Sequence, residues 1–264
     1  MKKTNFHTHN YRCGHAVGNV EDYVKEAIKH NYTELGISDH SPLPDYCFDR
    51  MGMDELEGYF EEIEMAQKKY KGKIKIYKSL EAEYFPEFSE FYEKLKTKLD
   101  YLLLGLHLYP KNGKINDAWA IKDDEGVIDY AYFMKDAIES NYFEIVAHPD
   151  VFMAGYRNWT EACIEATHII CRAAEKMDIV LEINANGIRK TEEKNIKGDR
   201  YLYPYKEFWE IVAEYNIRTI IGSDCHDYKM IEDEAIQKVR EFARELNIYP
   251  IETIFQIIKI KIII

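Results

Sequence analysis

The sequence lacks long hydrophobic runs and paired cysteines. No apolar run in its 264 residues approaches the length of roughly 20 residues that a membrane span needs. The two lysines after Met1 are not followed by an apolar segment, so no signal peptide is expected. The five cysteines are odd in number, scattered and never spaced as Cys-x-x-Cys, which indicates reduced thiols and predicts a cytoplasmic protein without a membrane partner.

Positive charge is also scarce. The chain carries 35 lysines and arginines against 47 acidic residues, a formal net charge of −12. Such a surface repels a phosphate backbone at long range, so nucleic acid is not an expected partner. Hydrophobic residues make up 46% and charged residues 31%, as in folded water-soluble domains. Any phosphate group that binds here must therefore meet local positive charge.

Short apolar, β-branched runs alternate with amphipathic segments, a pattern typical of a parallel sheet covered by helices. The predicted strands are residues 4–9, 34–39, 74–83, 101–109, 143–150, 179–186 and 218–226. Four helical stripes begin near Val20, Leu56, Cys163 and Ala235, the first after the N-cap candidate Asn19. Because no linker or repeat interrupts the pattern, we predict one α/β domain over residues 1–264, a barrel. We assign no function to the isoleucine-rich tail at about 252–264.

Seven of the nine histidines lie at or just after the ends of predicted strands. They are His7, His9, His15, His40, His107, His148 and His226. In a parallel α/β barrel, the loops that follow the carboxyl ends of the strands form the active-site face. The sequence therefore predicts a functional site built largely from imidazoles at that face.

Two histidine pairs of spacing two suggest metal binding. Alternate residues of a strand point to the same side, so His7 and His9 can bind one divalent ion, although an exposed edge strand is the simpler alternative. Asp224 and His226 have the same spacing, but Asp224 could instead cap the following helix. Imidazole with carboxylate suits zinc, manganese or iron better than magnesium or calcium.

Glu81 and Glu83 end the third predicted strand and share a face. A carboxylate inside a barrel is costly unless it is paired or bound to metal, so one of the two is expected to bridge two ions. Strand parity alone does not separate them. Together, these strand ends offer about ten nitrogen and oxygen ligands, more than one ion can use. The sequence therefore predicts a multinuclear metal centre.

The ordered set of motifs resembles the PHP (polymerase and histidinol phosphatase) superfamily. The motifs are His7-Thr8-His9, His15, Asp39-His40, Glu81, His107, His148-Pro149 and Asp224-Cys225-His226. Residues 12–16 and 38–42 look most like the stand-alone histidinol-phosphate phosphatases. The resemblance implies a distorted, TIM-barrel-like (β/α)7 barrel that holds three divalent ions, of zinc, manganese or iron.

The resemblance also distributes the ligands. It places His7, His9, Glu81 and Asp224 on the first ion. Glu81 would bridge to a second ion bound by His107 and His148. The third ion would take His15, His40 and His226. The choice of Glu81 over Glu83 comes from the family's pattern.

The implied reaction is hydrolysis of L-histidinol phosphate to L-histidinol and phosphate in histidine biosynthesis, by metal-activated hydroxide attack on phosphorus. The substrate is thus a small phosphate monoester. Asp224, His226 and His40 are the catalytic candidates. Arg157 and Arg189 follow the fifth and sixth strands and are expected to bind the substrate, although each could instead form a surface salt bridge.

Three other functions stay open. A PHP-type phosphoesterase or exonuclease would act on nucleotides or oligonucleotides, but the negative charge argues against a polynucleotide. An amidohydrolase would also begin with a strand-borne His-x-His, but would leave His15 and His40 without a role. A metal store or a partner-binding barrel that has lost activity is the last alternative, and the intact ligand set argues against it.

Overall fold

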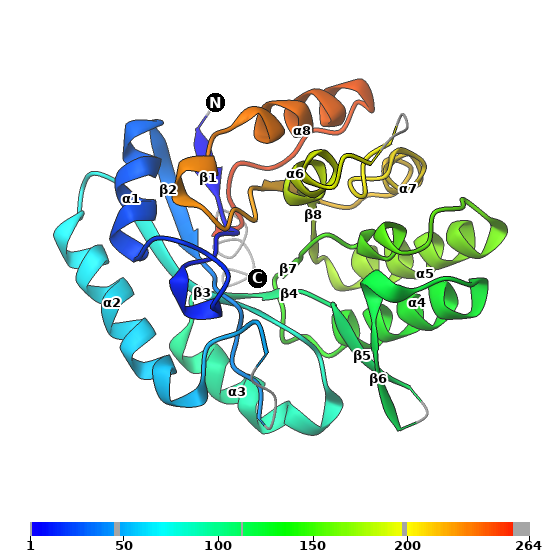
Figure 1. Ribbon diagram of the computed structural model, residues 1–264, viewed down its shortest axis with the longest axis horizontal. Helices are drawn as coiled ribbons and strands as arrows, with labels where there is room; N and C mark the ends of the chain where they lie inside the picture. The colour runs from blue at the N-terminus through cyan, green and yellow to red at the C-terminus, as the bar shows by residue number, and fades with distance from the viewer. Residues whose placement is uncertain (1, 45–47, 112, 197–199, 256–264) are drawn as a thin grey trace, which may run out of the picture.

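Seven parallel strands form the centre of the protein (Figure 1). The computed structural model describes residues 2–44, 48–111, 113–196 and 200–255. The strands lie in the order β1 (Lys3–Asn5), β2 (Tyr32–Ile37), β3 (Lys75–Ala82), β4 (Tyr101–Leu104), β7 (Ile145–Val146), β8 (Val180–Asn184) and β9 (Thr219–Gly222). Each contains residues of one predicted strand, so the strand predictions are confirmed, with shorter bounds.

The sheet closes between its first and last strands. Beyond β1 and β9, Thr8 and Cys225 form a parallel bridge, and the Asp224 amide donates a hydrogen bond of 2.9 Å to the His7 carbonyl. The predicted distorted (β/α)7 barrel is thereby confirmed. The strands end early because the chain turns there: His148 and Asp224 have positive φ angles of 31° and 48°. Residues other than glycine rarely adopt positive φ angles, and those that do are common at functional sites.

Helices surround the strands, as Figure 1 shows. They are α1 (Val20–Lys29), α2 (Leu56–Lys69), α3 (Ser89–Lys98), α4 (Asp124–Glu139), α5 (Glu161–Met177), α6 (Asn186–Glu193), α7 (Lys206–Val212) and α8 (Glu234–Glu245). Short 3₁₀ helices are η1 (Tyr11–Cys13), η2 (Met53–Glu55), η3 (Pro86–Phe88), η4 (Ala118–Ala120), η5 (Val151–Ala154) and η6 (Tyr228–Met230). The four predicted helices are confirmed as α1, α2, α5 and α8, and Asn19 caps α1 by accepting from the Asp22 amide. No helix in the described ranges is long and apolar enough to cross a membrane.

An antiparallel hairpin follows β4, where the sequence had predicted one continuous strand over residues 101–109. The hairpin consists of β5 (Leu108–Lys111) and β6 (Lys114–Asp117). The chain leaves the barrel after Leu104, and the His107 carbonyl accepts a hydrogen bond from the Ala118 amide at the base of the hairpin. This arrangement brings Asp117 and Trp119 to the carboxyl ends of the strands.

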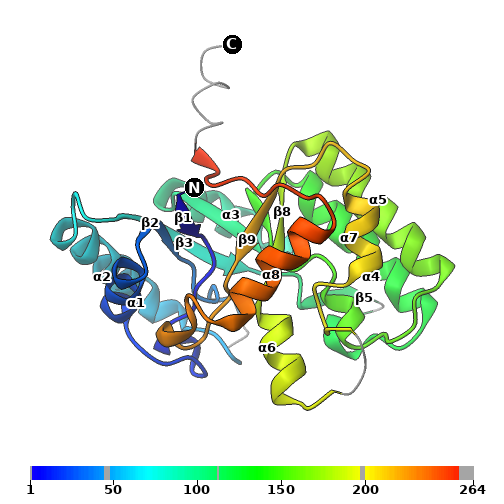
Figure 2. The same cartoon turned by 90° about the horizontal axis from the view of Figure 1, so that it is seen from above.

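The amino ends of the strands are covered by the C-terminal segment, residues 251–255 (Figure 2). The Ile251 amide donates to the Thr219 carbonyl at 2.8 Å, and the Phe255 ring stacks on Tyr77 with 4.0 Å between ring centroids. Ile254 is buried in the same apolar cluster. This end of the barrel is therefore sealed by side chains, while the predicted tail beyond residue 255 lies outside the described residues.

Candidate metal centre

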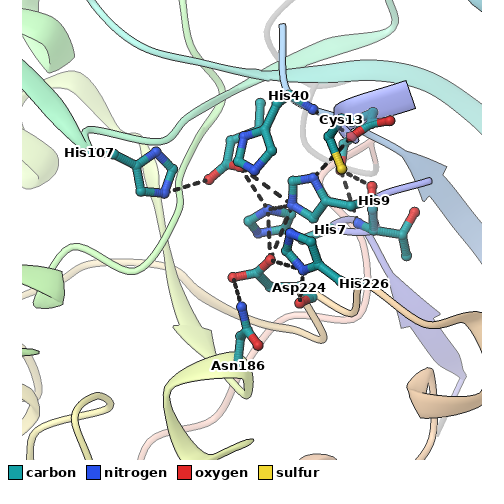
Figure 3. Close-up of polar contacts among 12 residues, drawn as sticks. His7, His9, Cys13, His40, His107, Asn186, Asp224 and His226 are labelled. Carbon is teal, nitrogen blue, oxygen red and sulfur yellow. Dashed lines mark hydrogen bonds and ion pairs between the residues drawn. The ribbon is translucent and has the colours of Figure 1, made fainter. Parts of the chain in front are cut away.

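The nine predicted metal ligands gather at the carboxyl ends of the strands, where Figure 3 shows most of them. Glu81 lies at the end of β3, and the other ligands follow β1, β2, β4, β7 and β9 or lie in the loop before α1. The structure groups their ligand atoms as His7 with His9 and Asp224, Glu81 with His107 and His148, and His15 with His40 and His226. Within each group, these atoms lie within 4.8 Å of one another.

The first group is the most tightly packed. The Nε2 atoms of His7 and His9 face each other at 3.0 Å, and Asp224 Oδ1 lies 3.1 Å from the His9 nitrogen. Glu81 Oε2 lies 3.4 Å from both ring nitrogens. Two buried ring nitrogens directed at each other, with two carboxylates beside them, are arranged as a shared cation would require.

Glu81 connects the groups. Its Oε1 atom lies 3.0 Å from His148 Nε2, and its Oε2 atom lies 3.1 Å from His40 Nδ1. The neighbouring strand leaves room for it, because a side chain at Gly105 would overlap the Glu81 carboxylate. Glu83 has a different position. Its Oε1 atom lies 2.9 Å from His107 Nδ1, and its Oε2 atom accepts a hydrogen bond from the His107 amide. Glu81 therefore lies at the centre of the cluster and Glu83 lies behind the His107 ring, and the bridging role of Glu81 stays a prediction.

The protonation of the cluster suits metal ligands. Burial alone would favour neutral carboxyls, but the surrounding imidazoles hold the pKa of Glu81 and Asp224 well below the usual range. Burial, with the nearby His9, lowers the pKa of His40 and His226 well below 6.5, so both rings are neutral at neutral pH. Ionised carboxylates and neutral imidazoles are the forms that bind divalent ions.

The imidazoles of His7 and His9, at the centre of the cluster, have raised pKa values instead. Although burial opposes the charged form, hydrogen bonds to Asp224 and Asp39 raise the pKa of His9 to about 9. Burial also opposes protonation of His7, but neighbouring carboxylates, Glu182 foremost, raise its pKa well above 6.5. Positive charge is therefore favoured between these rings, and a metal ion would supply it in place of protons.

Three rings are backed by carboxylates that the ligand prediction did not include. Glu182 lies 2.9 Å from His7 Nδ1, Asp39 lies 3.3 Å from His9 Nδ1, and Glu83 backs His107. Such partners fix the ring tautomer and orient the other nitrogen toward the metal. Glu182 had a visible signal in the sequence, since it is the charged residue within the apolar run of β8.

The donor set fits divalent metal ions. It consists of imidazoles and two ionised carboxylates. Five of the nine side chains are buried, His15 is exposed, and His40, His107 and His226 are half-buried. His148 faces Glu81 with its Nε2 atom, while its Nδ1 atom is buried without a hydrogen-bond partner among the described residues. Cys13 lies within the same 4.8 Å limit of His9 and His226, a neighbour the sequence had not indicated.

Arg189, one of the two predicted substrate contacts, is absent from the described lining of the cavity over the cluster, and its contact with substrate stays a prediction. Its guanidinium is buried and donates to Asp233 at 2.6 Å and to the Ser223 carbonyl at 2.5 Å, so it ties α6 to β9 and α8. Arg157 is exposed and is absent from the described lining of the cavity over the cluster. Its role in substrate binding stays a prediction.

A cavity of about 280 Å³ opens onto the cluster. Its walls include His40, Glu81, Asp224 and His226 from the cluster itself. The remaining walls include Arg50 from the segment before α2, Asp117 from β6, Trp119 from η4, Asn186 and Lys190 from α6, and Tyr203 from the segment before α7. The cavity can therefore admit a small molecule to the predicted ligand atoms.

Comparison with known proteins agrees with this arrangement. The profile of the PHP domain matches residues 5–186. Histidinol-phosphatase of Bacillus subtilis is 26% identical over 266 residues, which cover 86% of this chain and 94% of that protein. A Deinococcus radiodurans protein named "probable histidinol-phosphatase" is 26% identical over 230 residues, covering 83% of this chain and 85% of that one.

A solved structure shares the fold. Histidinol phosphate phosphatase of Lactococcus lactis, in complex with zinc, L-histidinol and phosphate, superimposes with a TM-score of 0.72 at 20% identity, covering 95% of each chain. The domain match spans more than half of the sequence and runs through the strands that carry most of the cluster. We conclude that this chain belongs to the PHP domain family.

Proposed function

We propose that the protein is a metal-dependent phosphatase that hydrolyses L-histidinol phosphate to L-histidinol and phosphate in histidine biosynthesis. The observation that carries the proposal is the convergence of nine ligand-type side chains, with Glu81 at their centre. The names of the relatives that match over most of their length support the choice of substrate.

The residues would hold three divalent ions, of zinc, manganese or iron. His7, His9, Glu81 and Asp224 would bind the first, Glu81 with His107 and His148 the second, and His15, His40 and His226 the third. Bound there, such ions acidify water and neutralise phosphate oxygens, which is the chemistry that hydrolysis of a phosphate ester requires.

The protein's own groups would set the orientation of this site. Asn184 and Asn186 donate to Asp224 Oδ2 at 3.1 Å and 3.2 Å, which leaves Oδ1 directed at His9. Glu182 and Asp39 hold the outer nitrogens of the two central rings. Because these partners are buried, the ligands are preorganised before substrate binds.

Asp224, His226 and His40 are the proposed catalytic residues, and all three line the cavity. The imidazoles of His226 and His40 are neutral at neutral pH, so each can bind an ion or accept a proton from water. The Asp224 carboxylate stays ionised at the same pH and would orient the attacking water.

The proposed substrate is a small phosphate monoester, and the proposed location is the cytoplasm. A cavity of about 280 Å³ suits a small molecule rather than a polynucleotide. Cys13, Cys163, Cys171 and Cys225 are free thiols, which supports a reducing compartment, while Cys47 lies outside the described residues.

A substrate panel tests the proposal. Purified protein, with its metal content measured by elemental analysis, is assayed for phosphate release from L-histidinol phosphate, nucleoside monophosphates and short oligonucleotides. We expect kcat/KM for L-histidinol phosphate to exceed the others by about 100-fold, and we expect His9→Ala and Asp224→Ala to abolish the release. Preference for nucleotides or oligonucleotides would instead support the PHP-type phosphoesterase alternative.

A further inference from the structure

The cavity over the metal centre has a basic residue on each of two walls. Arg50 comes from the segment before α2, and Lys190 comes from α6. Neither belongs to the pair of arginines that the sequence had suggested. The two cations are in different situations, and the difference indicates which of them is available to a substrate.

Arg50 is held by the protein. Its guanidinium donates to the carbonyls of Phe48 and Ser41 at 3.1 Å and 3.3 Å and lies 3.6 Å from Glu83. The side chain is only 6% exposed. Arg50 therefore compensates the buried charge of Glu83, the carboxylate behind His107, and fixes the cavity wall.

Lys190 is placed toward the metal centre by the register of α6. Asn186, four residues earlier, donates to the proposed ligand Asp224, and residues four apart share one face of a helix. Both Asn186 and Lys190 line the cavity. The intervening Arg189 lies about 100° round the helix from Lys190 and is bound to Asp233, which explains why the lysine, and not the arginine, faces the site.

An aromatic ring holds the Lys190 side chain. Its Nζ lies 5.4 Å from the centroid of the Trp119 ring, and the Trp119 amide is bound in turn by Asp117. Within the described ranges, no carboxylate lies within 4.0 Å of this ammonium. A cation–π contact positions a charge without neutralising it, so the full positive charge stays available to an anion.

The electrostatics of the site call for such a charge. Five buried carboxylates surround the ring cluster, namely Asp39, Glu81, Glu83, Glu182 and Asp224. They offset much of the positive charge that divalent ions would bring. A phosphate ester therefore gains from a further cation at the mouth, and lysine is a common point-charge partner of phosphate.

We propose that Lys190, held over Trp119, binds the phosphate group of the substrate at the mouth of the metal centre. The inference rests on the proposed function for the identity of the ester, but not for the binding of phosphate itself. Lys190 is thus a substrate-binding residue of the site, while Trp119 acts through it as a positioning residue.

The test compares two lysines that contact the same ring. Lys190→Met is prepared as metal-loaded protein, and its affinity for inorganic phosphate is measured by calorimetry alongside KM for L-histidinol phosphate. Lys194→Met is the matched control, because Lys194 also lies 5.4 Å from the Trp119 centroid but is absent from the described cavity lining. We expect Lys190→Met to weaken phosphate binding and raise KM by about 10- to 100-fold, with unchanged metal content, and Lys194→Met to change either by less than about twofold.

Two results would overturn the inference: wild-type phosphate affinity in Lys190→Met, or equal losses in both variants. Lys190→Arg, which keeps the charge, should recover most of the affinity. Failure of the proposed function gives a different result, since wild-type protein would then bind phosphate in a Lys190-dependent manner yet leave L-histidinol phosphate intact.

Discussion

At the scale of single residues, the cluster is built from rings with a carboxylate behind them. His7, His9 and His107 each have an acidic partner at the outer nitrogen, in Glu182, Asp39 and Glu83. Only the ring nitrogen that faces the cluster is then available to a metal. The arrangement fixes both tautomer and orientation, which a histidine on its own does not.

Removal of one backing charge should weaken metal binding. We expect Glu182→Gln, which keeps the shape of the side chain, to lower metal affinity by about 10- to 100-fold, as measured by competition with a chromophoric chelator. Glu144→Gln is the control, because Glu144 is also a largely buried carboxylate that accepts a backbone amide, that of Leu102, but at the amino end of β4. Equal affinities in wild type and Glu182→Gln would show that the charge behind His7 is dispensable.

At the scale of secondary-structure elements, glycines in adjoining strands make room for the buried acids. A side chain at Gly105, just after β4, would overlap Glu81 of β3, and one at Gly222 of β9 would overlap Glu182 of β8. Large buried carboxylates therefore sit beside strand positions with no side chain. The packing of neighbouring strands thus decides where the ligands can be.

Gly105→Ala should displace Glu81 and lower the metal content of purified protein well below that of wild type, because the added methyl group occupies the space of the carboxylate. Elemental analysis and phosphatase activity give the readout. Gly58→Ala is the matched control: Gly58 lies within α2, its nearest contact would be 3.9 Å away, and alanine there should stabilise the helix by up to about 1 kcal/mol. A fully metal-loaded, active Gly105→Ala would contradict the role of this glycine.

A cluster of hydrogen bonds and ion pairs around Glu232 joins β1, β2 and α8. Glu232 accepts hydrogen bonds from Tyr32 at 2.5 Å, from Lys3 at 3.0 Å and from Arg240 at 2.6 Å. Burial alone would raise the pKa of Glu232, but these donors outweigh it and lower the pKa from 4.5 to about 2. The ionised carboxylate is therefore stabilised in the folded protein relative to the unfolded chain.

The sign of the pH dependence follows from that lower pKa. Glu232 stabilises the fold above about pH 4.5, and its contribution is lost as the pH falls toward 2. Since its partners are partly exposed, we expect Glu232→Gln to lose about 2 kcal/mol of unfolding free energy at pH 7. The difference from wild type, measured by urea denaturation at several pH values, should shrink below pH 4.5. A constant difference across that range would contradict the assignment.

Four helices with a strong local pattern were predicted, whereas α4, which also buries an apolar stripe, was not. The apolar stripes of α1, α2, α5 and α8 are visible in the sequence and all lie buried against the barrel. By contrast, α3 buries only Tyr92 and Leu95, so its pattern is weak. The sequence of the short α6 does not show which of its residues face the site, and Arg189 was predicted as a substrate contact. In the structure, the helix turns the Arg189 side chain toward Asp233.

At the scale of the whole molecule, the sequence predicted which ligand-type residues meet but not which carboxylates lie behind the rings. Carboxyl ends of parallel strands converge in a barrel, so the ordered histidines had to lie near one another. Glu182 and His7 are 175 positions apart, and no local spacing reveals that contact. The same holds for the central place of Glu81, which depends on three neighbouring strand ends.

Removal of the metal should affect the entire barrel. Without cations, buried carboxylates and imidazoles from six strands must balance one another's charge, so we expect exhaustive chelation to abolish activity and lower the thermal midpoint by about 10 °C. Calorimetry of chelated and zinc- or manganese-restored protein measures the change. Full activity in protein shown by elemental analysis to be metal-free would refute a metal-dependent reaction.

Closure of the sheet between β1 and β9 has a consequence for biosynthesis. A nascent chain leaves the ribosome with His7 and His9 first, but Asp224 and His226 emerge only after almost all of the barrel has been translated. The set of nine predicted metal ligands cannot be completed on an unfinished polypeptide. Acquisition of the full set of proposed ions would therefore report that translation has passed the last strand and that the two edges of the sheet have joined.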